Sequence, residues 1–318
     1  MSKTYFINRE FCPACKSKKH RTIYSCGFLE SPIKEFLESF YSPSPQGTIE
    51  FQYLNGAQFI LNECDDCHII FQQEIPNDFL MKKLYEQWID PQKVFFRWVQ
   101  NHSIDYYFRL AEEVMMLIAY FDSIPTQLKL LDFGMGWGHW CQMALAFGCD
   151  AYGTELSESR IEYAKSQGIK VITWAEISNY SFDFINMEQV CEHIADPLET
   201  LCVLKKSLKP EGLVKISVPD GKDIKRRLKI LDWTAPKGSR HSLNPVSPLE
   251  HINCFNHRSL IKMAELTGLE LVRIPLRIQY AAITNWKPIK RMLKNILKPF
   301  YSNMFKKDTC FFFAQKTK

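Results

Sequence analysis

The sequence predicts an α/β fold with a seven-stranded, mostly parallel sheet, preceded by a small cysteine-rich domain. From residue 127 onward, apolar strand-like segments alternate with helical patterns, which is typical of a parallel sheet with helices on both faces. Before residue 75, two Cys-x-x-Cys pairs flank a segment of alternating polarity. We therefore expect three parts: a zinc-ribbon-like domain over 1–75, a helical linker over 76–125, and the α/β domain over 126–318.

The composition is that of a protein without a membrane-spanning segment. No apolar run approaches the roughly 18 residues that a membrane helix needs, and residues 1–10 lack the apolar core of a signal peptide. A cytoplasmic location is therefore expected. The odd number of cysteines, 11, predicts reduced thiols rather than a disulfide scaffold. A net charge of +5 is compatible with a phosphorylated or acidic partner, does not itself indicate nucleic-acid binding, and leaves the oligomeric state open.

Two cysteine pairs predict a structural zinc ion. Each pair can form a knuckle that offers two thiolates to one tetrahedral ion, and four thiolates favour zinc over magnesium or calcium. The predicted ligands are Cys12, Cys15, Cys64 and Cys67. Strand-like alternation is expected over Thr48–Asn62, after an insertion near 31–47. Reduced structural cysteines, or a redox pair in one motif, are the alternatives, and the reserve ligands are His20, Cys26 and His68.

The linker is expected to form two helices. Asn77 is a suitable N-cap for a helix over Asp78–Trp88. A second helix is predicted over Ile104–Phe121, and Pro125 ends it before the first strand of the sheet. The strands themselves are expected near 128–133, 150–154, 169–173, 182–187, 213–218, 269–275 and 308–314.

The first two of these strands run into a nucleotide-binding pattern. The first ends in Asp132 and continues into Gly134, Gly136 and Gly138, followed by a helical run. Glycine lets backbone approach a ligand closely, and a strand, a glycine-rich turn and a helix N-terminus form a nucleotide cradle. The second strand ends in Glu155, about twenty residues past the glycines, where an acid can accept both hydroxyls of a ribose.

Together these segments resemble the class I S-adenosylmethionine-dependent methyltransferases over residues 126–275. The Asp132 loop matches the first motif of that family, Glu155 its acidic second motif, and Phe182-Asp183 with Glu192-His193 its fourth-strand region. The resemblance implies a Rossmann-like class I methyltransferase fold, in which the last strand, Thr309–Ala314, is an antiparallel edge strand. It also implies the cofactor S-adenosylmethionine.

Each cofactor contact is carried over from the resemblance. Asp132 is expected at the ammonium group and Glu155 at the ribose diol, with backbone around Gly134, Met135 and Gly136 beside the amino-acid and ribose portions. The remaining expected contacts are Leu156, Trp174 and Ala175 at the adenine, and Glu188 at the pocket mouth. The alternatives are helix–strand packing for Gly138, which we expect, a core position for Trp174, and capping roles for the acids.

The acceptor side is predicted at Glu192, His193 and His251. Methyl transfer from a sulfonium is an in-line displacement, so the enzyme mainly aligns the reactants and can remove a proton from the accepting atom. His193 is the predicted general base or orienter; the alternative is a histidine bonded to loop backbone that shapes the pocket. Related enzymes that hold magnesium here use an upstream Glu, and this chain has Gln189 instead, which argues against the metal.

Two basic segments suggest possible partners. The loop over 219–248 is expected to set acceptor specificity, and its cations suit a phosphate-bearing or acidic acceptor or, alternatively, form a solvated face. It contains Lys222, Lys225, Arg226, Arg227, Lys229, Trp233, Arg240 and His241. Residues 286–305 have an amphipathic, basic pattern. That segment is expected either to pack on the sheet or a partner subunit, or to make a peripheral contact with an anionic membrane surface.

The sequence therefore predicts a methyltransferase that acts on a small-molecule, sugar, nucleotide-sugar or glycan acceptor, by O-methylation. One alternative is an RNA methyltransferase that uses the ribbon for nucleic acid; few basic residues surround the cysteines, which argues against it. A non-catalytic protein that retains the cofactor-binding fold is the other alternative, and the intact Asp132, glycines and Glu155 argue against it. No DNA partner is expected.

Overall fold

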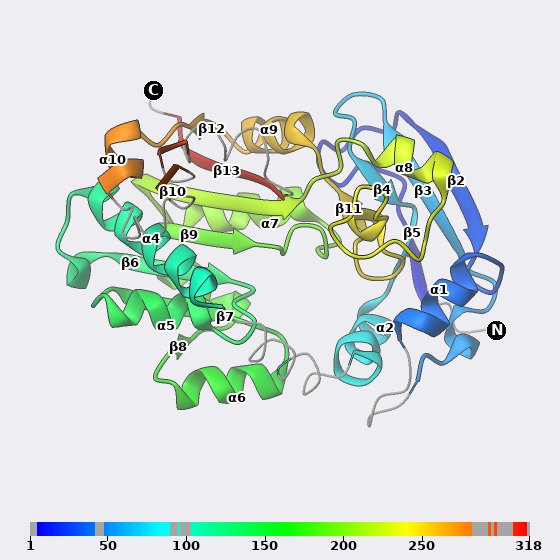
Figure 1. Cartoon of the computed structure of the whole chain (residues 1–318), viewed down its shortest axis with the longest axis horizontal. Coiled ribbons are helices and arrows are strands. Elements are labelled where there is room, and N and C mark those ends of the chain that lie inside the picture. The colour runs from blue at the N-terminus through cyan, green and yellow to red at the C-terminus, as the bar shows by residue number, and fades with distance from the viewer. Residues whose placement is uncertain are drawn as a thin grey trace. The chain divides into compact units, whose positions relative to one another are not determined.

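The computed structural model describes residues 5–41, 48–89, 95, 103–281, 292–293, 296–297 and 308–316. The chain forms two compact units (Figure 1). The N-terminal unit comprises Met1–Gln100, Cys191–Leu198 and Val218–Leu266, and the sheet unit comprises Asn101–Val190, Glu199–Ser217 and Thr267–Lys318. This grouping differs from the predicted division at 75 and 125, which assigned 191–198 and 218–266 to the α/β domain. Local sequence patterns do not reveal that the chain returns to its N-terminal unit twice.

The sheet unit is built on a seven-stranded sheet in the order β12-β13-β10-β9-β6-β7-β8. The five strands from β10 to β8 pair in parallel, and β12 pairs antiparallel with β13. Their bounds are Lys129–Phe133 (β6), Asp150–Thr154 (β7), Lys170–Val171 (β8), Phe182–Glu188 (β9), Leu208–Pro219 (β10), Leu269–Val272 (β12) and Asp308–Gln315 (β13). All seven predicted strands are present, and the predicted fold class is confirmed.

The last strand corrects one expectation. β13 is antiparallel, as predicted, but it lies inside the sheet between β12 and β10, so β12 is the edge strand. Phe313 in β13 is fully buried, as an interior strand requires. The edge position was carried over from the resemblance, and the strand order in this sheet corrects it.

The helices and turns of the sheet unit follow its strands. They are α4 (Ile104–Phe121), η3 (Pro125–Gln127), α5 (His139–Ala146), α6 (Glu158–Ser166), η4 (Trp174–Asn179), α7 (Pro197–Lys206) and α10 (Leu276–Ala281). α4 has the predicted bounds and contacts both α5 and α10. The first residues of α7 belong to the N-terminal unit. The core of the sheet unit includes Leu130, Trp140, Ala151 and Phe184.

The N-terminal unit contains two small sheets. β2 (His20–Gly27), β3 (Gln58–Cys64), β4 (Ile70–Gln72) and β11 (Asn253–Cys254) form one in the order β11-β4-β3-β2, and β1 (Phe6–Asn8) pairs with β5 (Glu74–Pro76). The helices and turns are α1 (Ile33–Phe40), η1 (Phe51–Leu54), α2 (Asp78–Lys83), the π-helical turn η2 (Leu84–Trp88), α8 (Ile224–Ile230), η5 (Asn244–Val246) and α9 (His257–Leu266).

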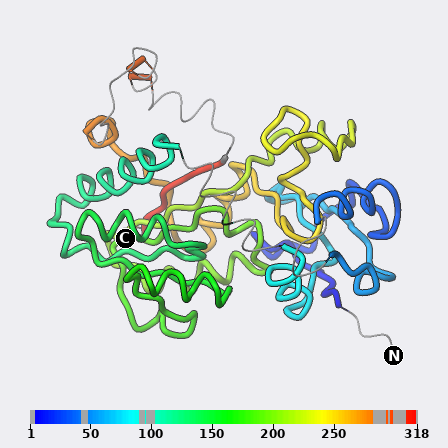
Figure 2. Tube along the Cα trace, turned by 60° about the horizontal axis from the view of Figure 1, so that its bottom comes forward, coloured from blue at the N-terminus to red at the C-terminus, as the bar shows by residue number. Residues whose placement is uncertain are grey.

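Residues 224–254, yellow to orange in Figure 2, lie beside the first segments of this unit. Their apolar side chains complete its core. Trp233, Val246 and Leu249 belong to the same buried cluster as Phe28 and Phe59. The indole of Trp233 lies against the Phe59 ring, with 5.8 Å between the ring centroids. Residues separated by about 200 positions therefore share one core, and Trp233 is a core aromatic rather than part of an acceptor site.

The predicted elements before residue 126 hold in part. The Asn77 side chain accepts a hydrogen bond from the amide of Leu80 and caps α2, as predicted, and the helix continues as η2 to Trp88. The predicted alternation over Thr48–Asn62 gives a strand only from Gln58, because a 3-10 turn at 51–54 and Gly56 at φ +80° interrupt it. The predicted basic helix over 286–305 lies outside the described residues, apart from 292–293 and 296–297.

Candidate cofactor, acceptor and metal sites

The three glycines after β6 have different roles. Each has a positive φ, which favours glycine. A Cβ on Gly138 would lie 2.4 Å from Ile169 Cδ1, and one on Gly134 would lie 2.7 Å from Val190 Cγ2, so both permit close packing. A Cβ on Gly136 would meet nothing within 4 Å. Gly136 is therefore the position where backbone borders open space, and the expected packing role of Gly138 fits the structure.

Asp132 ends β6 beside an amide from β9. The Asn186 side chain donates to Asp132 Oδ1 at 2.7 Å, and Asp132 is 4% exposed. Burial raises the pKa of Asp132 to about 7, although the Asn186 hydrogen bond and the charge of Lys215 oppose the rise. Asn186 Oδ1 is buried without a hydrogen-bond partner among the described residues. A carboxyl group next to this buried acceptor oxygen suits the ammonium group of S-adenosylmethionine.

Glu155 follows β7 and is fixed by backbone amides. Its Oε1 accepts from the amides of Leu156 at 2.8 Å and Ser157 at 3.1 Å, and its Oε2 accepts from the amide of Gly136 at 3.0 Å. The carboxylate thus borders the open space at Gly136. Arg160 Nη1 of α6 also lies 3.6 Å from Oε2. A carboxylate offers about four acceptor positions, and the three amides occupy three of them. At most one therefore remains for a ribose hydroxyl, and a second hydroxyl requires displacement of an amide.

The expected adenine contacts are exposed apolar residues of the sheet unit. Leu156 is 95% exposed and Trp174 is 46% exposed, so both are accessible to a ligand. Trp174 begins η4 and its indole lies against Phe133, with 5.5 Å between ring centroids. Ala175 follows and is exposed. Met135 instead points inward, since it is 7% exposed and its sulfur packs at Gly153.

The expected pocket residue Glu188 belongs to an ion-pair network that the sequence analysis missed. Glu188 Oε2 lies 2.6 Å from Lys215 Nζ, and Lys215 also contacts Glu113 of α4 at 2.8 Å. Burial lowers the pKa of Lys215, but the two carboxylates outweigh burial and the net shift is upward. Glu113 also accepts from the indole of Trp140 at 2.9 Å. The sequence signal for this network is Lys215 itself, because a lysine between Val214 and Ile216 of an apolar strand requires a buried partner.

The predicted acceptor-side residues lie together in the N-terminal unit. His193 Nδ1 lies 2.8 Å from the carbonyl oxygen of Glu250 and 3.0 Å from Tyr85 Oη. A carbonyl oxygen only accepts, so Nδ1 carries the proton and Nε2 is the proton-accepting nitrogen. A bond from His193 to loop backbone was expected if the histidine only shapes the pocket, and the Glu250 contact is such a bond. The same bond also sets the tautomer that a general base needs.

His251 is held in the same way. Its Nδ1 bonds to the carbonyl oxygen of Asn244, and its ring centroid lies 4.9 Å from that of His193. Burial, and then the neighbouring His193, lower the pKa of His251 well below its ordinary value, so this imidazole is neutral at neutral pH. Glu192 is 1% exposed, with Oε1 at 3.8 Å from His193 Nε2. Ligand-capable atoms of Glu192, His193 and His251 all lie within 4.8 Å of one another.

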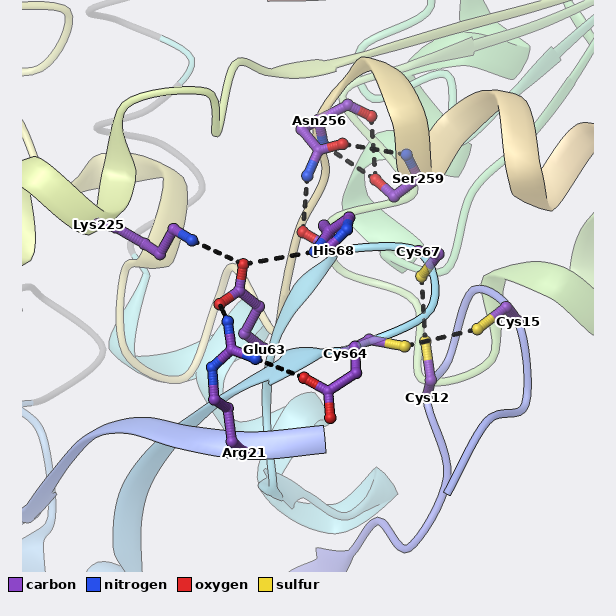
Figure 3. Close-up of polar contacts among 11 residues, drawn as sticks. Cys12, Cys15, Arg21, Glu63, Cys64, Cys67, His68, Lys225, Asn256 and Ser259 are labelled. Carbon is purple, nitrogen blue, oxygen red and sulfur yellow. Dashed lines mark hydrogen bonds and ion pairs between the residues drawn. The ribbon is translucent and has the colours of Figure 1, made fainter. Parts of the chain in front are cut away.

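The four predicted zinc ligands form one cluster (Figure 3). Their sulfur atoms lie within 4.8 Å of one another, with 3.5 Å between Cys12 and Cys67 and 3.6 Å between Cys15 and Cys64. Tetrahedral zinc with Zn–S bonds of about 2.3 Å separates its sulfurs by about 3.8 Å. The reserve ligands His20, Cys26 and His68 are not part of this cluster.

The two cysteine pairs are local copies of one knuckle. In the first, the amide of Lys16 donates to the Cys12 carbonyl at 2.9 Å; in the second, the amide of His68 donates to the Cys64 carbonyl at 3.0 Å. Lys16 and His68 both have φ +60°, the left-handed conformation that turns the chain back. The pKa of Cys12 is lowered to about 6, mainly by the hydrogen bond from Cys67, so one thiol of the cluster readily loses its proton.

The cations of the loop over 219–248 are only partly available for an acceptor. Lys225 contacts Glu63 at 2.8 Å, and Arg227 donates to the carbonyl oxygen of Ser242 (Figure 3 shows Lys225). Both therefore stabilise the N-terminal unit. Lys222, Lys229 and Arg240 are exposed. Arg226, which lies 3.8 Å from Asp223, and Lys237 are exposed as well. The prediction of a phosphate-bearing or acidic acceptor rests on these exposed cations.

The fold and the glycine loop together define a class I methyltransferase. A family model described as a methyltransferase domain matches residues 105–274, more than half of the 318-residue chain. The chain belongs to this methyltransferase family. Its seven-stranded sheet has five parallel strands, then the antiparallel pair β12 and β13, and Asp132 and Glu155 end adjacent strands beside Gly136.

Curated relatives with similar sequences share one name. The ubiquinone biosynthesis O-methyltransferase of Idiomarina loihiensis is 26% identical over 46% of this chain and 63% of its own length. The protein of the same name from Bartonella bacilliformis is 30% identical over 39% of this chain and 56% of its own length. The chain thus spans less than two thirds of the length of the curated relatives it matches.

Solved structures with a similar fold are more distant. The plantazolicin methyltransferase BamL is 14% identical with a TM-score of 0.49, over 74% of this chain and 95% of its own. Magnesium protoporphyrin IX methyltransferase from Synechocystis PCC 6803 is 11% identical with a TM-score of 0.47, over 76% of this chain and 100% of its own. Within the part of the chain that the structure describes, no helix has the length and apolar character to cross a membrane.

Proposed function

We propose that the protein is an S-adenosylmethionine-dependent methyltransferase that methylates a hydroxyl group of a small-molecule, sugar, nucleotide-sugar or glycan acceptor. The tautomer of His193 is the observation that carries O-methylation, because a hydroxyl must lose its proton and Nε2 is the nitrogen that accepts one. The shared O-methyltransferase name of the curated relatives supports the same reaction class. A structural zinc ion on the four cysteines is part of the proposal.

Cofactor binding and proton removal are assigned to different residues. When bound, S-adenosylmethionine supplies a methyl group that its sulfonium already activates for attack. Asp132 and Asn186 hold the ammonium end, and Glu155 holds the ribose. His193 takes the proton of the accepting hydroxyl on Nε2, while Nδ1 remains bonded to the Glu250 carbonyl. The His251 ring packs against the His193 ring and supports its orientation, with 4.9 Å between the ring centroids.

The cofactor assignment is tested with Glu155→Gln. The amide keeps the size of the side chain but loses the charge that accepts the ribose hydroxyls. A hydrogen bond to a charged acceptor is worth roughly 1.5–3 kcal/mol, and one acceptor position is open to the ribose, so the Kd for S-adenosylmethionine should rise by about 10- to 100-fold. Isothermal titration calorimetry measures it, with Glu158→Gln in the first turn of α6 as the control. Unchanged affinity in Glu155→Gln would rule out this placement of the ribose.

The base assignment is tested with His193→Gln once a screen of hydroxylated acceptors for S-adenosylhomocysteine release has found a substrate. Turnover should fall by about 10²–10⁴, the contribution of a general base, while the cofactor Kd stays within twofold. His257→Gln, on α9 of the same unit, is the matched control and should keep turnover. Turnover of the His193 variant within a few-fold of the parent across pH would leave alignment alone as the means of catalysis.

A further inference from the structure

Residues 191–196, here called the histidine loop, carry Glu192 and His193. We propose that Arg9 and Asn253 are positioning residues that make the conformation of the histidine loop depend on the four-cysteine site. The proposal rests on the proposed function, because it is the role of His193 that gives the loop its importance. All the contacts that carry it lie within the N-terminal unit.

Asn253 holds the histidine loop from inside. Its Nδ2 donates to the carbonyl oxygens of Cys191 at 3.0 Å and Ile194 at 2.7 Å, and its backbone amide donates to the carbonyl oxygen of Glu192 at 3.1 Å. The side chain is fully buried. One asparagine thus satisfies three carbonyl groups in four consecutive residues, which fixes the loop backbone directly around Glu192 and His193.

Arg9 holds Asn253 in turn. Its Nη1 donates to Asn253 Oδ1 at 2.8 Å and to the Ala195 carbonyl at 3.4 Å, and its Nη2 donates to the Ile252 carbonyl at 2.7 Å. The guanidinium also bonds to the Gln72 carbonyl through Nε at 2.9 Å and lies over the Phe71 ring. The planar fork of arginine suits such simultaneous contacts, and a lysine cannot reproduce them.

These two residues connect to both cysteine knuckles through short stretches of chain. Arg9 precedes Cys12 by three residues, and β4 begins three residues after Cys67. β4 pairs with β11 (Figure 1). In their register Asn253 lies opposite Phe71. A metal ion that joins the knuckles therefore fixes the positions of the two segments that hold Asn253.

A third link leaves the first knuckle directly. Lys16, which follows the ligand Cys15 in the left-handed conformation, forms an ion pair with Asp196 at the end of the histidine loop. Both side chains are partly exposed, so the pair by itself is weak. The segments adjacent to the cysteines thus contact the histidine loop directly at Ala195 and Asp196. Asn253, which those segments hold, contacts residues 191, 192 and 194. We call this set of contacts, from the four cysteines through Arg9 and Asn253 to the histidine loop, the relay. Removal or oxidation of the cysteine site should therefore loosen the histidine loop.

Hydrogen exchange of the full chain, with zinc content and cofactor binding measured in parallel, tests the relay. Asn253→Asp keeps the acceptor for Arg9 but loses the two donated bonds, and Arg9→Lys keeps the charge but loses the fork. In both, amides of 191–196 should exchange about 10- to 100-fold faster, as the loss of two hydrogen bonds predicts. Zinc should remain at one per chain, the Kd of S-adenosylhomocysteine should stay within twofold, and kcat should fall without a matching rise in KM.

Matched controls separate positioning from general loosening. Asn62→Asp changes another fully buried asparagine of the same unit, and Arg21→Lys changes an arginine that pairs with Glu63 and Asp65 beside the second knuckle. Asn62 bonds to Thr22 and Gln73, and Arg21 pairs with Glu63 and Asp65, so both variants should leave exchange of the histidine loop unchanged. Wild-type exchange of 191–196 in Arg9→Lys and Asn253→Asp with zinc retained, or equal loosening in the controls, would overturn the relay.

The other possible outcomes distinguish failure of the relay from failure of the proposed function. If Asn253→Asp loses zinc or fails to fold, Arg9→Lys alone settles the question by the same criteria. If the loop loosens selectively in the variants but the parent protein binds no cofactor, the proposed function fails and the relay stands. If the parent binds cofactor and methylates an acceptor but exchange of residues 191–196 is unchanged in both variants, the relay fails and the proposed function stands.

Discussion

At the scale of single residues, Asp132 shows how burial prepares a site for a cation. Its folded-state pKa of about 7 lies above the roughly 3.9 of an unfolded chain. Asp132 therefore contributes stability that is complete below about pH 4 and is lost as the pH rises through about 7. A cationic ligand reverses this preference, because its ammonium group favours the carboxylate. Burial of Asp132 thus lowers the folding stability near neutral pH, and it leaves a carboxyl group that ionises when the cofactor binds.

Cofactor binding should accordingly release a proton from Asp132. At pH 6 most of the unliganded protein carries that proton, so binding should release close to one proton and tighten as the pH rises toward 7. Calorimetric titrations in two buffers of different ionisation enthalpy count the protons. Asp132→Asn, which cannot ionise, should bind more weakly and release none. Binding of the parent at pH 6 without proton release would contradict the assignment of Asp132 to the ammonium.

The sequence can predict candidate site residues where they belong to a local motif. Asp132, Gly136 and Glu155 were predicted because a strand, a glycine turn and a helix start occur together in about 25 residues. Lys215 and Asn253 could not be assigned partners, since Glu113 is 102 residues from Lys215 and Cys191 is 62 residues from Asn253. A buried charge or amide in an apolar strand signals that a partner exists, but the fold decides which residue it is.

At the scale of elements, regular patterns were predictable and their neighbours were not. All seven strands of the large sheet and the bounds of α4 follow from periodicity and capping. The inner position of β13 does not, because strand order is set by packing across the whole sheet. The strand predicted to begin at Thr48 begins only at Gln58, because alternating polarity also occurs where Gly56 and a 3-10 turn interrupt extended backbone.

The paired knuckles predict one zinc ion per chain. Their matching turns bring four sulfurs to near the separation that tetrahedral zinc requires. Elemental analysis of the purified full chain should find one equivalent, and Cys12→Ser with Cys64→Ser should remove it. Cys26→Ser is the control, since the Cys26 thiol bonds to the Ser31 carbonyl outside the cluster and its loss should leave zinc in place. A metal-free parent protein with an equally protected N-terminal segment by hydrogen exchange would count against a zinc site.

At the scale of the whole molecule, the chain alternates between two units that each have their own core. Cys191–Leu198 and Val218–Leu266 return to the N-terminal unit, so the predicted acceptor residues share a unit with the zinc ligands, whereas Asp132 and Glu155 belong to the other. The two proposed ligands, zinc and the cofactor, therefore contact different cores. This division could not be read from composition, because the returning segments contain the same apolar residues as the sheet.

Thermal unfolding should separate the two ligands. S-adenosylhomocysteine at about 100 times its Kd stabilises what it binds by about 2.7 kcal/mol. For a unit of this size that corresponds to a rise in Tm of about 5–10 °C. Differential scanning calorimetry should show two transitions, of which only the one assigned to the sheet unit responds to this ligand. A zinc chelator should lower or abolish the other, because a structural metal contributes its binding free energy to folding. Glu155→Gln should remove the first response and Cys12→Ser the second, each without affecting the other. A single transition that responds to both ligands would show that the units unfold together and that zinc and cofactor are energetically coupled.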